Sequence, residues 1–344
     1  MNSETTRVGL QLLEQGEAFA WATILDTKGS SPRHAGADML VRADGSITGT
    51  IGGGPLEMSV AAQAKEMLGT GKWRLERFDS AGLGMMCGGG GLILVEDIDP
   101  RRPAAQHLFA RMAELLRQGE KGWLVTVLPG EAEERSAVRR CIVDSEGDVA
   151  GEAVHPLEEL GELARRGGTY DRILADDPGR VFVRLIGARG TAYVFGAGHC
   201  GQALVPVLSG LGFFTVIVDD RSDFASPERF PDADRIVVPA SFDAVVETLP
   251  VDEDSYVVIV TRGHSHDQSV LAQALRTQAG YIGMIGSRQK VADTFEALGR
   301  EGCSSDDLGR VHAPIGLAIG AETPEEIAIS IAAQLVQARA AKRR

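Results

Sequence analysis

Short apolar runs alternate regularly with longer helical segments from about Thr191 to the end of the chain. The pattern predicts five strands, at Ala192–Phe195, Phe214–Asp219, Arg235–Val238, Tyr256–Thr261 and Tyr281–Ile285. It predicts helices at His199–Leu211, Asp267–Ala279 and Arg288–Leu298, and a last helix that begins at Thr323 with Glu326 completing a capping box. The run Phe214–Asp219 is almost continuously apolar, as expected when helices cover both faces of a parallel sheet. We therefore expect a Rossmann-type, doubly wound parallel sheet in this part.

The first half of the chain has a different pattern, with many glycines between its predicted elements. Its predicted helices are Thr5–Gln15, Pro55–Leu68, Pro103–Gln118 and Pro156–Arg166. Its predicted strands are Ala18–Asp26, Asp38–Arg42, Ser46–Ile51, Trp73–Phe78, Gly91–Glu96, Trp123–Leu128, Arg140–Val143 and Arg180–Leu185. Asp44-Gly45 is a strong turn signal and joins the second and third strands as a hairpin. We expect a glycine-rich α/β domain over 1–188 and the Rossmann-type domain over 189–344.

Composition narrows the class of protein. The chain has 344 residues, 44% of them hydrophobic and 24% charged, which suits two globular domains. Its net charge of −13 argues against nucleic-acid or anionic-membrane binding, which requires a basic surface. The four cysteines form no CxxC pair, and neither a signal peptide nor an apolar run long enough to span a membrane is found. We expect a cytoplasmic protein.

The loop after the first Rossmann strand carries a dinucleotide-binding fingerprint. Gly196, Gly198 and Gly201 follow a strand and open a helix, and Asp219 ends the next strand. Such glycines allow a pyrophosphate to approach the helix N-terminus, while an acidic residue at that position accepts hydrogen bonds from a ribose. The alternative is a Rossmann scaffold that has lost its nucleotide.

Charged and imidazole side chains follow neighbouring strands of the same predicted sheet. Arg221, Arg262 and Arg288 would form a cationic rim suited to a phosphate, since the carboxyl ends of parallel strands share one edge. The three histidines near that edge are His199, His264 and His266. No single helix carries them at metal-ligand spacing, so capping or ligand contact is favoured over a metal site. Because a histidine can act as an acid or base in hydride transfer, the function of an NAD(P)-dependent oxidoreductase remains an alternative.

Three further motifs lie in the first half of the chain. The first, Gly29 to Arg33, contains Ser31 and Arg33. The second places Gly52, Gly53 and Gly54 at a helix start, an anion-binding geometry, with Glu57 in the first turn. Glu57 can also complement the helix dipole or accept an internal hydrogen bond. In the third, Cys87 lies among glycines, where it is either an exposed thiolate or a small buried thiol.

These motifs together resemble the XdhC/CoxI family, the xanthine dehydrogenase accessory proteins. GSSPR, GTIGGGPLE and CGG match the N-terminal part of that family, and VFGAGHCGQAL, VDDR, TRGHSHD, IGSR, HAPIGL and TPEEIA match its Rossmann domain. They occur in the family's order over most of the chain. Many CoxI-like members carry a cysteine where this chain has Gly54, so it looks like the xanthine dehydrogenase branch, with Cys87 as the preferred thiol.

The resemblance implies a chaperone rather than an enzyme with turnover of its own. Proteins of this family bind the molybdenum cofactor (molybdopterin), support its sulfuration by a cysteine desulfurase and insert it into apo-xanthine dehydrogenase or a related molybdenum hydroxylase. A homodimer is plausible for the family. The glycine loops and arginines would then hold the phosphate of the cofactor, and Cys87 is the candidate molybdenum contact. NAD(P) or another nucleotide in the Rossmann domain is the alternative ligand, and an adaptor that only docks onto the hydroxylase is a third interpretation.

Overall fold

The computed structural model describes residues 3–29, 33, 35–79, 89–128, 138–152, 172–174, 180–187 and 190–342. The chain divides into two compact units, Met1–Gly187 and Ala188–Arg344. The predicted helix Pro156–Arg166 lies outside the described residues. Among those residues, no helix has both the length and the apolar character needed to cross a membrane.

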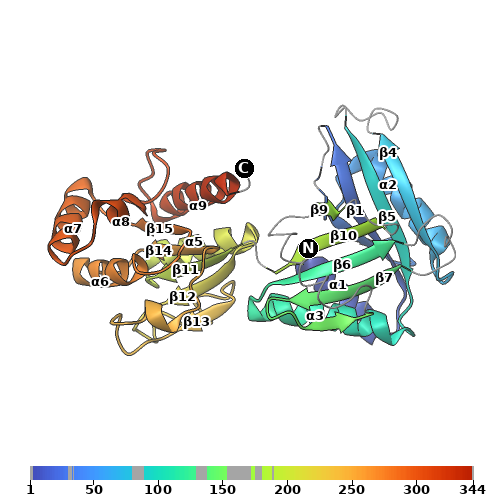
Figure 1. Ribbon diagram of the computed structural model, residues 1–344, viewed down its shortest axis with the longest axis horizontal. Coiled ribbons are helices and arrows are strands. Elements are labelled where there is room, and N and C mark those ends of the chain that lie inside the picture. Colours follow the sequence, from blue (N-terminus) through green and yellow to red (C-terminus); the bar gives the residue numbers. More distant parts are fainter. Residues whose placement is uncertain are drawn as a thin grey trace. The chain divides into compact units, whose positions relative to one another are not determined.

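The described residues of the first unit form two antiparallel sheets (Figure 1). One has the order β3-β2-β1-β5-β4, with β1 Phe19–Lys28, β2 Asp38–Val41, β3 Ile47–Gly49, β4 Trp73–Asp79 and β5 Gly90–Ile98. The other has the order β8-β7-β6-β10-β9, with β6 Gly122–Leu128, β7 Arg139–Asp144, β8 Val149–Gly151, β9 Arg172–Leu174 and β10 Arg180–Ile186. The predicted hairpin at Asp44-Gly45 is confirmed by the pairing of β2 with β3.

The described part of this unit also contains three helices, α1 Ser3–Glu14, α2 Gly54–Met67 and α3 Pro103–Gln118. Alternate residues of β1 face opposite sides of its sheet, as strand geometry requires. Ala22 and Ile24 pack with Leu56 and Val60 of α2. Residues of the opposite face, Trp21 among them, pack with α1, α3 and the second sheet in another cluster.

The second unit is a six-stranded parallel sheet of order β13-β12-β11-β14-β15-β16. Its strands are β11 Thr191–Phe195, β12 Phe214–Val218, β13 Arg235–Val237, β14 Ser255–Ile259, β15 Tyr281–Met284 and β16 Val311–His312. In chain order of its own strands this is 3-2-1-4-5-6, the arrangement of dinucleotide-binding folds. The predicted Rossmann-type sheet is therefore confirmed.

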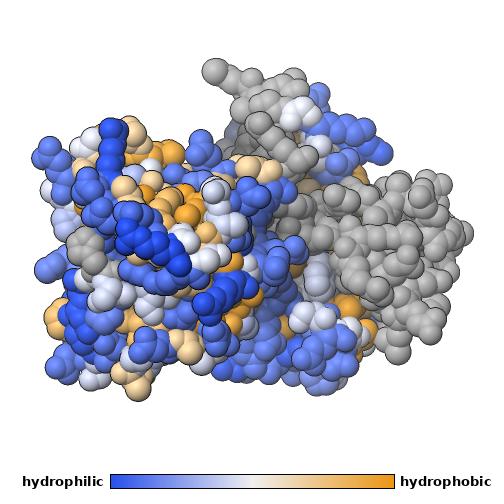
Figure 2. Space-filling view, turned by 60° about the vertical axis from the view of Figure 1, so that its left-hand side comes forward, coloured by the Kyte–Doolittle hydropathy of each residue, from blue (hydrophilic) through white to orange (hydrophobic). Residues whose placement is uncertain are grey.

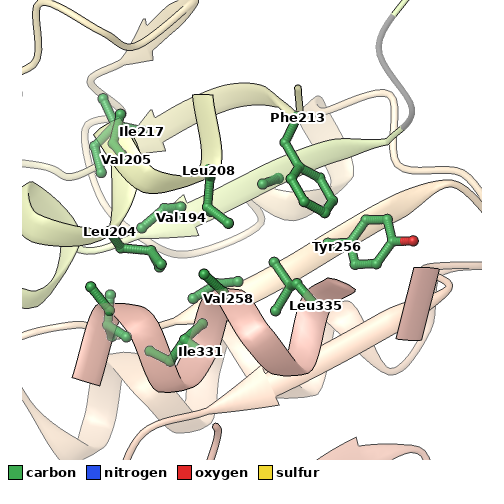
Figure 3. Packing of buried hydrophobic residues seen from close by; sticks show 14 of the residues in the cluster. Val194, Leu204, Val205, Leu208, Phe213, Ile217, Tyr256, Val258, Ile331 and Leu335 are labelled. Atoms are coloured by element: carbon green, nitrogen blue, oxygen red, sulfur yellow. The ribbon is translucent and has the colours of Figure 1, made fainter. Parts of the chain in front are cut away.

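Helices cover both faces of this sheet. They are α5 His199–Gly210, α6 His264–Ala274, α7 Arg288–Arg300, α8 Ser305–Gly309 and α9 Pro324–Ala341, with a 3₁₀ turn at Val246–Thr248. On one face α5 and α9 enclose a core in which Leu204 and Leu208 meet Val194, Val258 and Ile331 (Figure 3). On the other face α6 and α7 pack with residues such as Phe195 and Val257.

Helix α6 begins and ends earlier than the predicted Asp267–Ala279. It begins directly after Gly263, so Asp267 lies in its first turn, where its side chain accepts hydrogen bonds from the Thr261 amide and hydroxyl. After Ala274 the chain turns, and Arg310 donates to the carbonyls of Leu275, Thr277 and Ala279. At α9, by contrast, the predicted capping box of Thr323 and Glu326 is confirmed.

Candidate functional site

The glycine loop of the second unit joins β11 to α5. Its glycines differ in whether the structure leaves room for a side chain. At Gly196, with φ +120°, a Cβ would lie 2.3 Å from the Val260 carbonyl oxygen. At Gly201 it would lie 2.2 Å from the Gly196 carbonyl oxygen. At Gly198 a Cβ would meet nothing within 4 Å. Two glycines are therefore required by the fold itself, whereas Gly198 leaves open space in front of the helix N-terminus.

The Asp219 carboxylate holds this loop in place. It is 1% exposed and follows β12 directly. One oxygen accepts the Ala197 amide N–H at 2.8 Å, and both oxygens accept the Arg221 guanidinium at 2.8 and 2.9 Å. Burial raises the pKa of Asp219, but the hydrogen bonds from Arg221 and Ala197 outweigh burial and hold it below the usual value. The carboxylate that the sequence assigned to a ribose is thus already engaged by protein donors.

The predicted cationic rim is balanced by acidic side chains. Arg262 donates to both oxygens of Asp220, and its Nη1 lies 3.8 Å from the Asp219 carboxylate. The hydrogen bond from Arg262 lowers the pKa of Asp220. The Arg221 guanidinium lies 3.7 Å from the centre of the Phe224 ring. The structure therefore brings Arg221 and Arg262 together at this edge, but as partners of carboxylates.

Arg288 and the histidines lie around the same sheet edge in looser positions. Arg288 is exposed at the first turn of α7, and His199 is exposed at the start of α5. The His266 ring packs 5.1 Å from the Phe242 ring. The His264 backbone begins α6, while its side chain lies outside the described residues. Across the part of the chain that is described, no three His, Cys, Asp or Glu side chains are placed to hold a metal ion.

Two contacts at this edge were not anticipated from the sequence. Asp267, in the first turn of α6, is fully buried and forms an ion pair with Lys290 of α7, which links these two helices. Arg229 donates to the Gln202 side chain at 3.1 Å and to the Ala197 carbonyl at 3.5 Å. The aspartate was visible in TRGHSHD, but no local pattern indicates that its partner lies 23 positions away.

The glycine motif of the first unit has a carboxylate in its centre. Glu57 Oε1 accepts hydrogen bonds from the amides of Ile51 at 3.0 Å, Gly52 at 3.3 Å and Gly53 at 2.8 Å, and from the Thr50 hydroxyl. Burial raises the pKa of Glu57, but these hydrogen bonds outweigh it and the pKa lies below its usual value. Consecutive N–H groups of this kind form an anion-binding concavity. Here the anion is the protein's own side chain.

Open space adjoins that loop. Gly53 and Gly54 have φ of +77° and +60°, and a Cβ at either would meet no atom within 4 Å. The positive φ explains both glycines, and the space beside them is accessible to a ligand. Arg33 is exposed, while Ser31 and Cys87 lie outside the described residues.

Two of the cysteines that the structure describes, Cys141 and Cys200, have raised thiol pKa values. Cys141 is completely buried on β7, and burial raises the pKa of its thiol to about 11. Cys200, in the first turn of α5, is half-buried, and burial with the nearby Glu325 carboxylate raises its pKa. Cys303 is also half-buried.

Two family models match separate parts of the chain. The model described as "XdhC Rossmann domain" matches residues 192–335, and the model described as "XdhC and CoxI family" matches residues 12–79. The matches therefore fall on both structural units.

Curated relatives match nearly the whole chain. It is 30% identical to "Uncharacterized protein YqeB" of Escherichia coli K12 over 96% of this chain, but spans only 45% of that relative. It is 26% identical to a protein of Bacillus subtilis 168 named as a probable xanthine dehydrogenase subunit, covering 95% of each chain. It is 23% identical to "Molybdenum cofactor insertion chaperone PaoD" of E. coli K12, covering 97% of this chain and 87% of PaoD.

A crystal structure described as a xanthine dehydrogenase (BH1974) from Bacillus halodurans superposes on the chain with a TM-score of 0.77. The two are 29% identical, and the match covers 97% of this chain and 96% of the other. Because the family models, the relatives and this structure agree over both units, the chain belongs to the XdhC and CoxI family.

Proposed function

We propose that this protein is an accessory chaperone that binds the molybdenum cofactor and delivers it to xanthine dehydrogenase or a related molybdenum hydroxylase. The observation that carries the proposal is the match of 97% of the chain to PaoD, named as a molybdenum cofactor insertion chaperone. The Bacillus subtilis relative, whose name refers to xanthine dehydrogenase, supports the same client class.

The two open glycine loops supply the phosphate-binding elements of this proposal. Gly198 directly precedes a 12-residue helix, Gly53 directly precedes one of 14 residues, and Gly54 is the first residue of that second helix. Helix N-termini favour anions through their dipoles and free N–H groups. Exposed Arg33 and Arg288 are available to add positive charge. The remaining residues assigned to cofactor binding are Ser31, Gly52, Glu57, Cys87, Gly196, His199, Gly201, Asp219, Arg221, Arg262, His264 and His266.

The internal carboxylates suit a carrier that must release its cargo. Glu57 accepts the amides of one glycine loop, and Asp219 accepts an amide of the other. A phosphate that approaches either loop therefore meets N–H groups partly satisfied by a negative charge, which weakens its attraction. Moderate affinity follows, and moderate affinity permits transfer to a client enzyme.

Cys87 is the thiol that we assign to the metal end of the cofactor. Cys141 is completely buried, with a thiol pKa of about 11, and the pKa of Cys200 is also raised. A thiolate is the form that binds a soft metal centre. Cys87 lies beside Gly88 and Gly89 in the sequence. When bound, the cofactor would bring its own oxo-metal chemistry, and the protein would retain and shield it.

A retention and transfer experiment tests the proposal. Purified protein is incubated with molybdopterin carrying molybdenum, desalted, and assayed for retained pterin by the fluorescence of its oxidised form. The eluate is then mixed with apo-xanthine dehydrogenase, and hydroxylase activity is measured. We expect about one pterin per chain and an increase in reconstitution. Absence of both would refute a chaperone role, and co-purification with the hydroxylase alone would favour a docking adaptor.

The Cys87→Ala variant tests the assigned thiol. We expect retention of the cofactor to fall severalfold because a metal contact is lost. Cys303→Ala is the matched control, since Cys303 is a half-buried cysteine of the second unit. Equal retention of the cofactor by wild type and Cys87→Ala would refute the metal contact and indicate that Cys87 has a structural role.

Sulfuration of the bound cofactor by a cysteine desulfurase is the finer part of the proposal. It requires the loaded chaperone to bind the desulfurase, which a pull-down with and without bound cofactor measures. We expect the chaperone to capture the desulfurase only when the cofactor is bound. Capture that is equal with and without cofactor, or no capture, would refute the role in sulfuration but not the role in delivery.

An NAD(P)-dependent oxidoreductase is the second candidate, and the 3-2-1-4-5-6 strand order favours it. The engaged carboxylate of Asp219 counts against a ribose contact at the usual position. Calorimetric titration with NAD and NADP separates the two functions. Micromolar binding of either dinucleotide would support the enzyme, whereas flat titrations would exclude it.

A further inference from the structure

Two large apolar side chains are exposed in the described part of the first unit, and both flank the glycine loop 50–53. Met58 is 75% exposed and Ile47 is 40% exposed. Ile47 begins β3, which leads into the loop, and Met58 lies in α2, which leads out of it. Single exposed apolar residues are common on protein surfaces, but two that flank a candidate ligand loop indicate a binding surface.

Met58 belongs to a stripe along the solvent side of α2. Leu56 and Val60 pack into the core of the first sheet. At about 3.6 residues per turn, Met58 then lies on the opposite side of the helix. Exposed Pro55 and Ala62, three residues before and four residues after Met58, lie on that same side. The stripe therefore consists of apolar residues over two turns of the helix.

This side of α2 carries little charge for a surface helix. Within residues 54–64 the charged side chain is Glu57, which accepts hydrogen bonds from the loop amides. Surface helices normally present charged or polar residues to water. Figure 2 shows apolar residues interspersed among hydrophilic ones over the described residues of that face. An uncharged helix side that includes a methionine exposed to 75% indicates a surface that a partner covers.

Ile47 adds an apolar side chain on the same side of the sheet. It lies directly opposite Val41 in the pairing of β2 with β3, and directly opposite residues share a face. Val41 packs in the same cluster as the buried residues of α2. The hairpin turn also lies beside α2, because a Cβ at Gly45 would be 3.9 Å from the Lys65 amino nitrogen. Since β3 is an edge strand of the described sheet, a partner can approach from this side.

We propose that this apolar surface is where the client molybdenum hydroxylase docks during cofactor delivery; its residues are Ile47, Pro55, Met58 and Ala62. The inference rests on the proposed function. A cofactor passes directly between two proteins only when the client contacts the carrier beside the bound cofactor. Met58 lies about one helical turn from Gly54, where a Cβ would meet no atom within 4 Å.

The chemistry of the surface specifies the partner's contact region. The chain has a net charge of −13, so contacts through its charged surface would repel an acidic client. An uncharged patch instead docks on an apolar patch of the client, with little dependence on salt. The flexible thioether of Met58 adapts to that patch, and a small interface suits the transient contact that delivery requires.

Binding of the cofactor-loaded chaperone to immobilised apo-xanthine dehydrogenase tests the surface. Met58→Gln removes the apolar contact at similar volume without adding charge, so we expect about tenfold weaker binding. Ile47→Gln should weaken binding about threefold, since more than half of that residue is already covered in the free protein. Met58→Leu should stay within about twofold of wild type. Val238→Gln is the matched control and should bind like wild type, because Val238 is 46% exposed but belongs to the second unit.

Three further measurements separate docking from cofactor binding. Retention of the cofactor should be equal in wild type and Met58→Gln. Peroxide oxidation of Met58, followed by peptide mass spectrometry, should slow severalfold when apo-xanthine dehydrogenase is present, whereas completely buried Met39 should react slowly throughout. Raising the salt concentration from about 50 to about 300 mM should change binding by about twofold or less.

Four results would overturn the docking surface. They are equal binding by wild type and Met58→Gln, equal loss with Val238→Gln, steep salt dependence, and oxidation of Met58 that the client does not slow. If wild type still retains and transfers the cofactor, delivery stands and the docking surface alone is wrong. If wild type neither retains nor transfers it, the proposed function fails and the docking surface fails with it. A changed sedimentation mass of Met58→Gln would assign the surface to a second copy of the chain and also overturn the proposal.

Discussion

Replacing Glu57 by alanine removes the acceptor from the centre of the first-unit glycine loop. In the folded protein Glu57 Oε1 accepts three amide N–H groups, two of them at 2.8 and 3.0 Å, and a hydroxyl. A hydrogen bond to a charged group contributes about 1.5–3 kcal/mol. The loop is partly open to water, and water can replace some of these hydrogen bonds in the variant. We therefore expect Glu57→Ala to lower the free energy of unfolding by about 2–4 kcal/mol. For a unit of this size that corresponds to a fall in melting temperature of about 6–12 °C.

Glu57→Gln separates the charge from the hydrogen bonds. The amide oxygen can still accept from the loop, so we expect a smaller loss of about 1–2 kcal/mol. The pKa of Glu57 is lowered by folding from a usual value of 4.5. Its charge therefore stabilises the folded state above about pH 4.5, and this contribution is lost as the pH falls through the lower folded pKa. The difference between wild type and Glu57→Gln should shrink towards zero in acid.

Hydrogen exchange and calorimetry measure these effects. The amides of Ile51 and Gly53 should exchange faster in Glu57→Ala, and the transition of the first unit should shift to lower temperature. Glu66→Ala, an exposed glutamate on the same helix, is the control and should change neither. Unchanged exchange at pH 7, or a Glu57→Gln deficit that stays constant down to pH 3, would refute the reasoning.

Three further predictions concern residues whose surroundings differ sharply. Gly201→Ala should destabilise the second unit by about 3 kcal/mol or more in urea unfolding, since its Cβ would lie 2.2 Å from a loop carbonyl oxygen. Gly198→Ala, with no atom within 4 Å, should stay within about 1 kcal/mol of wild type; equal losses would contradict the loop geometry. Asp219→Asn should lower the free energy of unfolding by about 2–4 kcal/mol, because it removes the charge of a buried carboxylate that pairs with a guanidinium. An unchanged stability would argue against that pairing. In peptide mapping after iodoacetamide treatment at pH 8, Cys141, with a thiol pKa of about 11, should react only on unfolding, whereas half-buried Cys303 should react sooner; fast native labelling of the former would contradict its burial.

Local sequence signals predicted the elements of the second unit well. The capping box of Thr323 and Glu326, the strand and glycine loop around Gly196, and the fold class all agree with the structure. The capping box and the glycine loop depend on residues within one helical turn or one strand. The fold class follows from the regular alternation of strands and helices along the chain. The short strands β8, β9 and β16 were not predicted, because two or three residues carry too little periodicity.

The environments of the site residues could not be predicted in the same way. That Asp219 and Glu57 both lie close to glycine loops follows from the sequence. That their carboxylates are already engaged depends on distances between backbone amides and side chains that only the folded chain sets. The pairing of Asp267 with Lys290 similarly depends on how α7 packs beside α6. Sequence patterns therefore located the sites, while the folded geometry determined which groups are available to a ligand.

The position of β10 has a consequence for how the protein is made. This strand ends at Ile186, the last part of the first unit, yet it lies inside the second sheet between β6 and β9. Its Arg184 also donates to the Gly36 carbonyl, 148 positions earlier. A nascent chain that ends before β10 therefore exposes the edge of β6, and exposed edges invite aggregation. Molecular chaperones should therefore be able to bind the incompletely folded first unit until the ribosome has begun to synthesise the Rossmann domain. Fragments made to express the first unit alone should extend through Gly187.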